Sequence, residues 1–121
     1  MFCYQCQETA RNTGCTVRGV CGKSEETAAL QDLLIHLLKG ISFFGLKLKE
    51  MGAEDREDDL FLVQALFSTI TNAAWDNKRF ADLIREALRR RELLERRFRR
   101  LYEEKEGGEF DGPLPDACTW A

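Results

Sequence analysis

Residues 24–51 read SEETAALQDLLIHLLKGISFFGLKLKEM, and their apolar positions recur with the three-to-four-residue spacing of one face of an α-helix. The face consists of Leu30, Leu33, Leu34, Leu37, Leu38, Ile41, Phe44 and Leu48. Ser24 is the expected N-cap, and Gly52 is the expected stop after the last turn. Gly40 and Gly45 interrupt the helix and are expected to allow a close helix crossing or a kink. The pattern predicts one long helix whose apolar face is covered by other helices.

Two further segments show the same helical period. A second helix is predicted from Arg56 to Ala74, with an inward face made of Leu60, Val63, Leu66, Phe67 and Ile70. A third is predicted from its cap, Asp76, to about Lys105, with a stripe made of Phe80, Leu83, Ile84, Ala87, Leu88, Leu94, Phe98, Leu101 and Tyr102. Because the connections are short and no segment alternates like a strand, we expect an all-α fold with a three-helix bundle over residues 24–106. Residues 107–121 are expected to form a turn-rich tail.

The composition is that of an ordinary globular protein. The chain has 121 residues, a length that is enough for one domain. Of these residues 44% are hydrophobic, and the net charge is −3. No apolar run is expected to cross a bilayer and no secretory signal is expected, so we predict a cytoplasmic protein without membrane contact.

The arginines of residues 76–106 are interleaved with glutamates. Pairs such as Glu92–Arg96 and Glu95–Arg99 predict a salt-bridged helix face instead of nucleic-acid binding.

The cysteines are the most informative residues. The chain has five, and four of them lie within the first 21 residues. These four are Cys3, Cys6, Cys15 and Cys21, and they belong to an irregular loop over residues 1–23. Clustered thiols in a reducing compartment favour a metal site over disulfides. The first pair can supply two thiolates from one tight turn, and the longer spacings let the chain supply two more from the other side. Gly14, Gly19 and Gly22 are expected to let the backbone approach the sulfur atoms.

Two kinds of metal site are compatible with this spacing. Structural zinc sites usually pair two short knuckles with ligands two to four residues apart, whereas five residues separate Cys15 from Cys21. The loop also has no histidine and no strand pattern of a zinc ribbon. The spacing therefore favours an iron–sulfur cluster. The alternative is a zinc-stabilised helical interaction module with no redox role.

The residues around the cysteines closely resemble the start of the hybrid-cluster (prismane) proteins. The resemblance rests on MFCYQCQETA (residues 1–10), on GCT (14–16) and on VCGK (20–23). Further along the chain, LQDLL (30–34), LFSTITN (66–72) and LPD (114–116) look like the same family. The resemblance thus covers essentially the whole chain.

This resemblance implies a [4Fe–4S] cluster on Cys3, Cys6, Cys15 and Cys21. Proteins of the family are known as hydroxylamine reductases, are linked to nitric-oxide stress, and are similar in architecture to the catalytic subunit of carbon monoxide dehydrogenase. Their substrate is reduced at a hybrid iron–sulfur–oxygen cluster, whose cysteine, glutamate and histidine ligands lie well downstream. The resemblance therefore implies an electron-transfer region. Its expected partners are an electron donor protein and the remainder of a hybrid-cluster protein.

The ligands of that hybrid cluster are not expected in this chain. After Cys21 the sequence has one cysteine, Cys118, and one histidine, His36. Both are expected to be structural, Cys118 as a small packing side chain and His36 as a partly buried or surface residue. We therefore expect the chain to be the N-terminal part of a hybrid-cluster protein, cut from a longer fold and inactive as a hydroxylamine reductase on its own.

Four aromatic residues complete the expectations. Phe2 and Tyr4 flank the first cysteine and are expected to shield the cluster from water. Trp75, between the second and third predicted helices, and Trp120 are expected to be packing residues.

Overall fold

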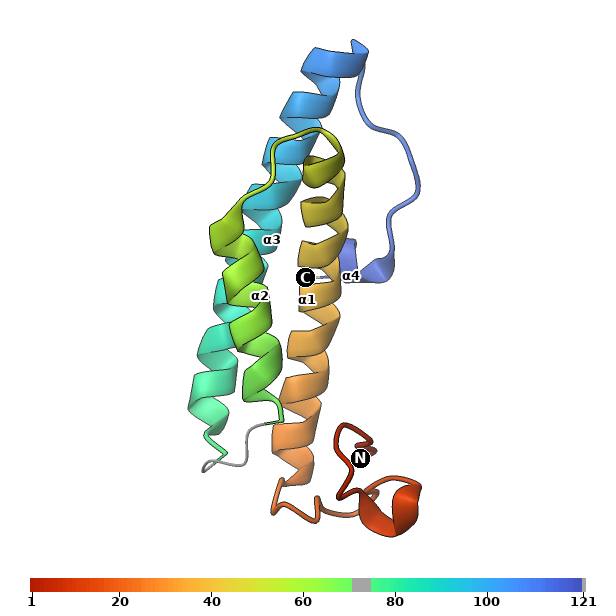
Figure 1. Cartoon of the computed structure of the whole chain (residues 1–121), viewed down its shortest axis with the longest axis vertical. Coiled ribbons are helices and arrows are strands. Elements are labelled where there is room, and N and C mark those ends of the chain that lie inside the picture. The colour runs from red at the N-terminus through yellow and green to blue at the C-terminus, as the bar shows by residue number, and fades with distance from the viewer. Residues whose placement is uncertain (71–74, 121) are drawn as a thin grey trace.

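The computed structural model describes residues 1–70 and 75–120, and over these ranges the fold is all-α, as predicted. Three long helices, α1 (Glu25–Glu50), α2 (Arg56–Ser68) and α3 (Asn77–Glu106), run up, down and up the molecule (Figure 1). A 3₁₀ turn, η1 (Ala10–Asn12), lies in the N-terminal loop, and a short helix, α4 (Asp116–Thr119), lies near the C-terminus. The predicted second helix reached further along the chain, but residues 71–74 lie outside the described residues and α2 ends at Ser68.

The helix ends lie where their capping residues predict. Ser24 accepts a hydrogen bond from the Thr27 N–H at 3.1 Å, and Asp76 accepts one from the Lys78 N–H at 3.0 Å. Asp55 caps α2 in the same way. Gly52 follows α1 with a φ of 71°, a left-handed conformation that favours glycine. Each side-chain cap contributes about 1 kcal/mol by satisfying an N–H group that has no partner within the helix.

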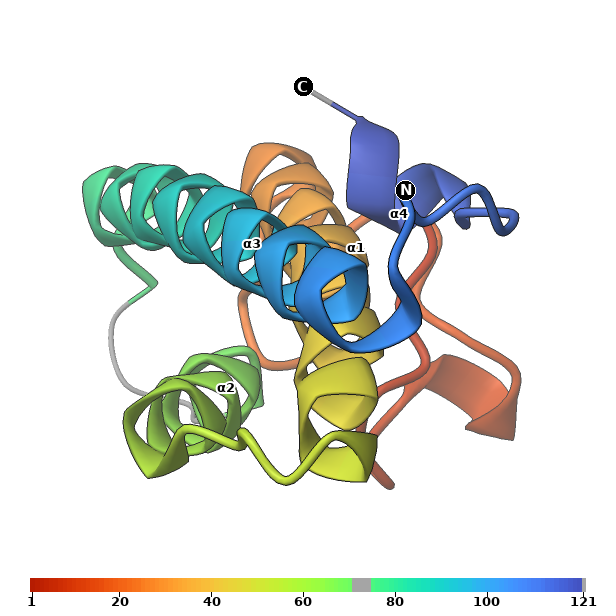
Figure 2. The same cartoon turned by 90° about the horizontal axis from the view of Figure 1, so that it is seen from above.

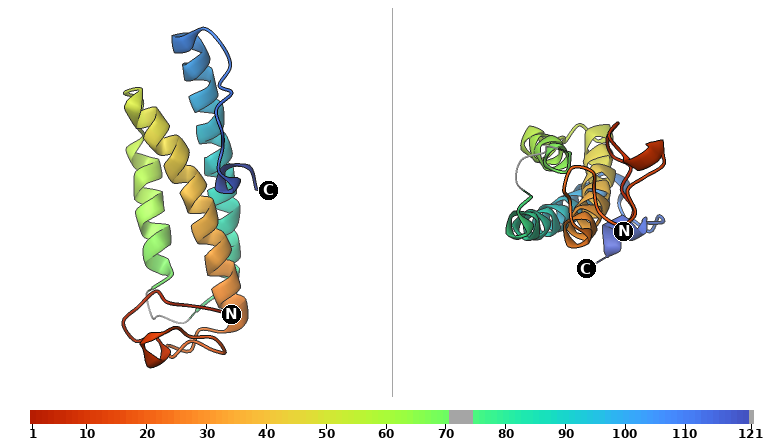
Figure 3. Two further views of the ribbon diagram at one scale, coloured as in Figure 1. Left: turned by 90° about the vertical axis from the view of Figure 1, so that its right-hand side faces the viewer. Right: turned by 90° about the horizontal axis from the view of Figure 1, so that it is seen from below.

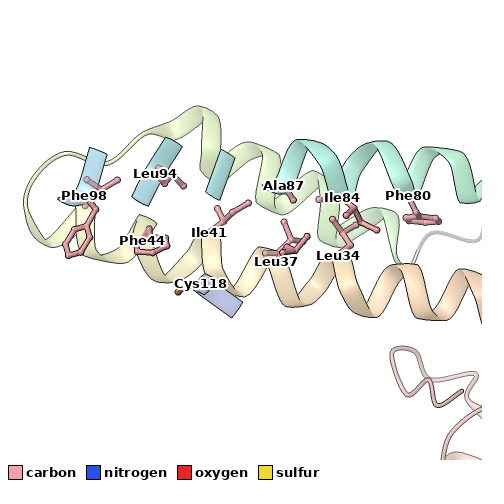
Figure 4. Close-up of a cluster of buried hydrophobic side chains, with 13 residues drawn as sticks. Leu34, Leu37, Ile41, Phe44, Phe80, Ile84, Ala87, Leu94, Phe98 and Cys118 are labelled. Atoms are coloured by element: carbon pink, nitrogen blue, oxygen red, sulfur yellow. The ribbon is translucent and has the colours of Figure 1, made fainter. Parts of the chain in front are cut away.

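The hydrophobic core lies between α1 and α3, where buried side chains of the two helices face each other (Figure 4). From α1 these are chiefly Leu34, Leu37, Leu38, Ile41, Phe44 and Leu48, and from α3 they are Phe80, Ile84, Ala87, Leu94 and Phe98. Fully burying a side chain of this size contributes about 1.5–3 kcal/mol. The α1–α3 interface is therefore the main source of stability, and the spacing-based prediction of both helix faces is confirmed.

The prediction for the apolar face of α2 is wrong. Ala65 is the one buried residue described in this helix, whereas the residues predicted to face inward are exposed. Their exposed fractions are Leu60 55%, Val63 62%, Leu66 39%, Phe67 61% and, just after the helix, Ile70 51%. The helical period identifies an apolar face correctly, but it does not show what covers that face. In this structure α2 turns a different side, with Phe61 and Leu62 partly buried, toward the core.

A charged side chain joins α2 to α3. Arg90 of α3 is mostly buried, and its guanidinium donates to Asp58 of α2 at 2.8 Å and to Glu86 of its own helix at 2.8 Å. It also lies 4.6 Å from the ring centroid of Phe61. Cation–π contacts and half-buried ion pairs of this kind contribute more than exposed ones, because water screens them less. The predicted surface pairs Glu92–Arg96 and Glu95–Arg99 are also present, at 2.8 and 3.0 Å.

The C-terminal segment, predicted as a turn-rich tail, includes the short helix α4, returns to α1 and packs against it. Figure 2 shows α4 on the side of α1 away from α2. Phe110 contacts the rings of Phe98 and Tyr102, with centroids 5.0 and 5.2 Å apart. The Arg91 guanidinium donates to the Ala117 carbonyl at 3.0 Å. This short helix therefore closes the core on its open side.

The two glycines of α1 have different roles. At Gly40 a Cβ atom would overlap the Ala117 carbonyl of α4 and would lie 2.9 Å from Cδ of Arg91. At Gly45 a Cβ atom would meet nothing within 4 Å. The expectation of a close crossing is therefore met at Gly40, where the backbone of α4 contacts α1, and not at Gly45.

The structure also corrects the expectation that no segment is long and apolar enough to cross a membrane. By length and composition alone, α1 meets that criterion, and it is the one described helix that does. Core helices of globular domains meet the same criterion because they are long and apolar too. Much of the apolar face of α1 is buried against α3 and α4, so its composition is accounted for by the core.

The two glycines provide a matched pair of substitutions. Gly45→Ala is expected to stabilise the fold by up to about 1 kcal/mol, because alanine favours the helix and the added methyl has free space. Gly40→Ala is expected to destabilise it by about 1–3 kcal/mol, because the methyl displaces α4. Urea unfolding followed by far-UV circular dichroism measures both. Equal effects of the two substitutions would show that α4 is not seated on Gly40.

Candidate metal centre

Backbone hydrogen bonds place two of the four N-terminal cysteines side by side. Cys3 and Cys15 form an isolated antiparallel bridge, in which each N–H donates to the other's carbonyl at 2.9 Å. Directly opposed residues of an antiparallel pair project their side chains to the same face. Between them the chain turns through η1, and the Thr9 hydroxyl donates to the Cys3 carbonyl at 3.1 Å. Residues 4–14 thus form one closed loop that returns Cys15, the third cysteine, to Cys3, the first.

A tight turn delivers the fourth cysteine. The Gly22 N–H donates to the Gly19 carbonyl at 2.9 Å, and the Gly19 N–H donates to the Lys23 carbonyl at 2.8 Å. Gly22 has a φ of 91°, which side-chain-bearing residues rarely adopt. A Cβ atom at Gly19 would lie 3.1 Å from the Cys21 sulfur and 2.9 Å from Cβ of Lys23. The expected close approach of the backbone to sulfur is therefore present at Gly19.

All four predicted cysteines line one cavity of about 310 Å³. The cavity lies at the end of the bundle where α1 begins and α2 ends, and Figure 3 shows the N-terminal loop folded against this end. The rest of its wall comes from the loop and from residues near the ends of α2 and α3: Gln5, Glu8, Thr9, Gly19, Val20, Lys23, Thr69, Ile70 and Trp75. The loop supplies the thiols and most of the wall, and Thr69, Ile70 and Trp75 close it on the side of the bundle.

The four thiols differ in their access to solvent. Cys15 is buried, Cys3 and Cys21 are half-buried, and Cys6 is exposed. All five cysteines of the chain are free thiols in the described structure. The cavity therefore has a buried side, near Cys15, and an open side, near Cys6.

Hydrogen bonds favour the thiolate form of Cys15. The Ala10 N–H donates to its sulfur at 3.4 Å. The N–H groups of Ala10 and then Val20 are the main causes that lower the pKa of Cys15, against the opposing effect of burial. The Thr9 hydroxyl and the charge of Lys23 lower this pKa further. Since the thiolate is the metal ligand, these contacts prepare Cys15 to bind a metal.

Polar groups of the loop and of the end of α2 lie around Cys3 in the same cavity. Lys23, only 3% exposed, directs Nζ to the Cys3 sulfur at 3.4 Å and to Oε1 of Gln5 at 2.9 Å. The Gln5 amide in turn donates to Oγ1 of Thr69 at 3.0 Å. The same Nζ lies 5.1 Å from the centroid of the Trp75 ring. The Cys15 sulfur thus has a backbone N–H donor from Ala10, and the Cys3 sulfur has the ammonium of Lys23 as its donor.

These residues fit an iron–sulfur cluster. Four thiols around one cavity supply the all-sulfur donor set that such clusters require, with hydrogen-bond donors directed at the sulfurs. Among residues 1–70 and 75–120, no three histidine, cysteine or acidic side chains converge closely enough to hold a single metal ion.

The structure changes the interpretation of several aromatic residues. Phe2 and Tyr4, expected to shield the cluster, are 58% and 61% exposed, and neither lines the cavity. Their rings are parallel, with centroids 6.5 Å apart, on the outside of the loop. Trp75, expected only to pack, lines the cavity and also contacts Phe80. It is separated from the cysteines by more than fifty residues, so no local spacing could have placed it there.

Cys118 and His36 lie away from the cavity, as expected for structural residues. Cys118 is 1% exposed and belongs to the hydrophobic core, where burial raises the pKa of its thiol. His36 contacts Asp116 of α4, with Nε2 and Oδ2 2.8 Å apart. Both residues help to hold α4 against α1.

The chain is similar in sequence to several known proteins. The model of the Prismane/CO dehydrogenase family matches residues 1–110. The hydroxylamine reductase of Nitratidesulfovibrio vulgaris is 59% identical over 120 residues, and that of Halothermothrix orenii is 57% identical over 120. The hydroxylamine reductase of Petrotoga mobilis is 51% identical over the same length. Each match covers 99% of this chain, whereas the chain spans only 22% of the length of each relative.

Thiol labelling of the reduced, metal-free chain tests the placement of the cysteines. Exposed Cys6 is expected to react first with iodoacetamide, and Cys118 last, because burial both blocks access and raises its pKa. Pulsed alkylation followed by mass spectrometry gives the rate at each site, and the urea-unfolded chain is the control in which the differences disappear. Equal labelling of Cys118 and Cys6 under native conditions would contradict the docking of α4.

Proposed function

Because the chain belongs to the Prismane/CO dehydrogenase family, we propose that its N-terminal loop binds a [4Fe–4S] cluster through Cys3, Cys6, Cys15 and Cys21. One observation carries this proposal: all four cysteines of the loop line a single cavity. The family implies iron–sulfur cofactors in general, and the four-cysteine set is the complement that one [4Fe–4S] cluster needs.

The cluster's proposed role is electron transfer. When bound, a [4Fe–4S] cluster gains and releases one electron at a time. Exposed Cys6 brings one side of the cavity to the protein surface, where an electron donor protein could approach, while Cys15 is buried within the loop. Ala10 and Lys23 direct donors at the sulfurs, and such hydrogen bonds set the reduction potential of the site.

We further propose that this region serves a longer hydroxylamine reductase, the name that its relatives carry. Reduction of hydroxylamine to ammonia consumes two electrons and two protons, and a one-electron relay delivers those electrons singly. The catalytic hybrid cluster would lie in the downstream part. The one cysteine outside the proposed cluster ligands, Cys118, and the one histidine, His36, already hold α4 in place. A link to nitric-oxide stress and a cytoplasmic location, in keeping with free thiols, belong to the same proposal.

The exposed face of α2 supports a contact with the remainder of such a protein. Leu60, Val63 and Phe67 are each more than half exposed, and Leu46 of α1 is 61% exposed. A surface pocket lined by residues of α1, α2 and the α4 segment includes Leu46 and Leu66. Adjacent apolar side chains of this size are usually covered by protein. Since the relatives are more than four times longer than this chain, we propose that their further residues cover this face.

Metal analysis of the chain prepared without oxygen tests the cluster directly. We expect about four iron and four sulfide per chain, with the charge-transfer absorption of a thiolate-bound cluster. Replacing Cys3, Cys6, Cys15 or Cys21 by alanine is expected to remove most of the iron. Cys118→Ala is the matched control and is expected to retain it, because Cys118 lies in the core.

Two results would decide against the proposal. One zinc ion and no iron in anaerobically prepared chain would instead indicate the zinc-stabilised interaction module. Iron binding that survives each of the four single substitutions would show that these cysteines are not the ligands.

A further inference from the structure

Lys23 is a buried cation surrounded by neutral groups. Its side chain reaches the cavity wall, and the residue is 3% exposed. Nζ donates to Oε1 of Gln5 at 2.9 Å and to the Thr69 carbonyl at 3.4 Å, and it faces the Trp75 ring. Within the part of the chain that the structure describes, no carboxylate lies within ion-pair distance of it. A buried ammonium without a negative partner is costly, so its position requires explanation.

The nearest group able to carry a negative charge is a proposed cluster ligand. The Cys3 sulfur lies 3.4 Å from Nζ, on the cavity side of the side chain. Once the cysteines bind metal they do so as thiolates, and the cluster with its four thiolates has a net negative charge. Glu8 also lines the cavity but makes no ion pair with Lys23. The bound site would therefore supply a negative charge in direct contact with the ammonium.

We propose that Lys23 is a positioning residue that holds its ammonium beside Cys3. Through Cys3, this fixed positive charge raises the reduction potential of the cluster. This inference rests on the proposed iron–sulfur function. Adding an electron makes the cluster and its thiolates more negative by one charge. A positive charge held close by stabilises the reduced form more than the oxidised form, and a hydrogen bond to sulfur acts in the same direction.

The surroundings of Lys23 hold its charge in one place. The Gln5 side chain bridges Nζ and the hydroxyl of Thr69, and Thr69 itself is 1% exposed. The Lys23 carbonyl accepts a hydrogen bond from the Gly19 N–H, across the turn that contains Cys21. A lysine side chain is normally mobile, but here both its backbone and its ammonium are held. Burial also keeps the charge from being screened by salt, unlike a charge at the surface.

Three substitutions separate charge from hydrogen bonding and packing. Lys23→Met removes the charge and the donor, Lys23→Gln keeps a donor without charge, and Lys23→Arg keeps both. Arg18, an exposed cation of the same loop, provides the control substitution Arg18→Met. The reduction potential of each anaerobically loaded chain is measured by redox titration, following the electron paramagnetic resonance signal of the reduced cluster. Iron and sulfide contents are measured alongside.

We expect a more negative potential in Lys23→Met and Lys23→Gln, and a return toward the wild-type value in Lys23→Arg. Arg18→Met is expected to leave the potential nearly unchanged, because water screens that charge. The shift in the Lys23 variants should persist when the salt concentration is raised.

Several outcomes overturn the inference. A wild-type potential in Lys23→Gln and Lys23→Met would show that the charge does not act on the cluster. A potential in Lys23→Arg as negative as in Lys23→Gln would show the same. Loss of the cluster from all three variants, with helical circular dichroism intact, would make Lys23 necessary for assembly instead of tuning. Absence of iron and sulfide from the wild-type chain would defeat the proposed function itself, and the inference with it, before any variant is compared.

Discussion

The packing of α1 against α3 supports everything else in the molecule. Leu34, Ile41 and Phe44 of α1 are almost completely buried, opposite Ile84, Leu94 and Phe98 of α3. Because these helices are long and parallel, their common end forms a stable base. The N-terminal loop folds against that base, and the cavity lined by the cysteines lies between the two. A rigid bundle can therefore hold one wall of a metal site whose other wall is an irregular loop.

The loop itself depends on backbone hydrogen bonds more than on hydrophobic packing. The Cys3–Cys15 bridge and the Gly19–Gly22 turn bring distant thiols to one cavity with few apolar contacts. Val17 and Val20 of this loop are 85% and 62% exposed, so apolar burial contributes little to its order. Metal binding commonly supplies folding free energy to loops of this kind. The fold and the proposed cofactor are in this sense coupled, with Lys23 at the contact between them.

Apolar side chains are covered on one side of the molecule and exposed on the other. On one side α4 and Phe110 cover the core, anchored by Arg91 and by the His36–Asp116 pair. On the other side α2 is held by Ala65 and the Arg90 contacts, and its larger apolar residues remain exposed. A longer protein of this family has the additional chain needed to cover that side. The exposed face and the short length relative to the relatives thus have one common explanation under the proposed function.

The sequence by itself determined the long helices, their caps, the faces of α1 and α3, and the four cysteines as a group. These features depend on residues within a few positions of one another, such as Ser24 with Thr27 or the helical repeat of Leu34 and Leu38. Only the tertiary structure decided that the apolar face of α2 is exposed, that α4 seats on Gly40, and that Phe2 and Tyr4 lie outside the cavity. The same holds for Lys23, Thr69 and Trp75 as cavity residues. The physical reason is that periodicity shows which side of a helix is apolar, whereas burial depends on partners far away in the chain.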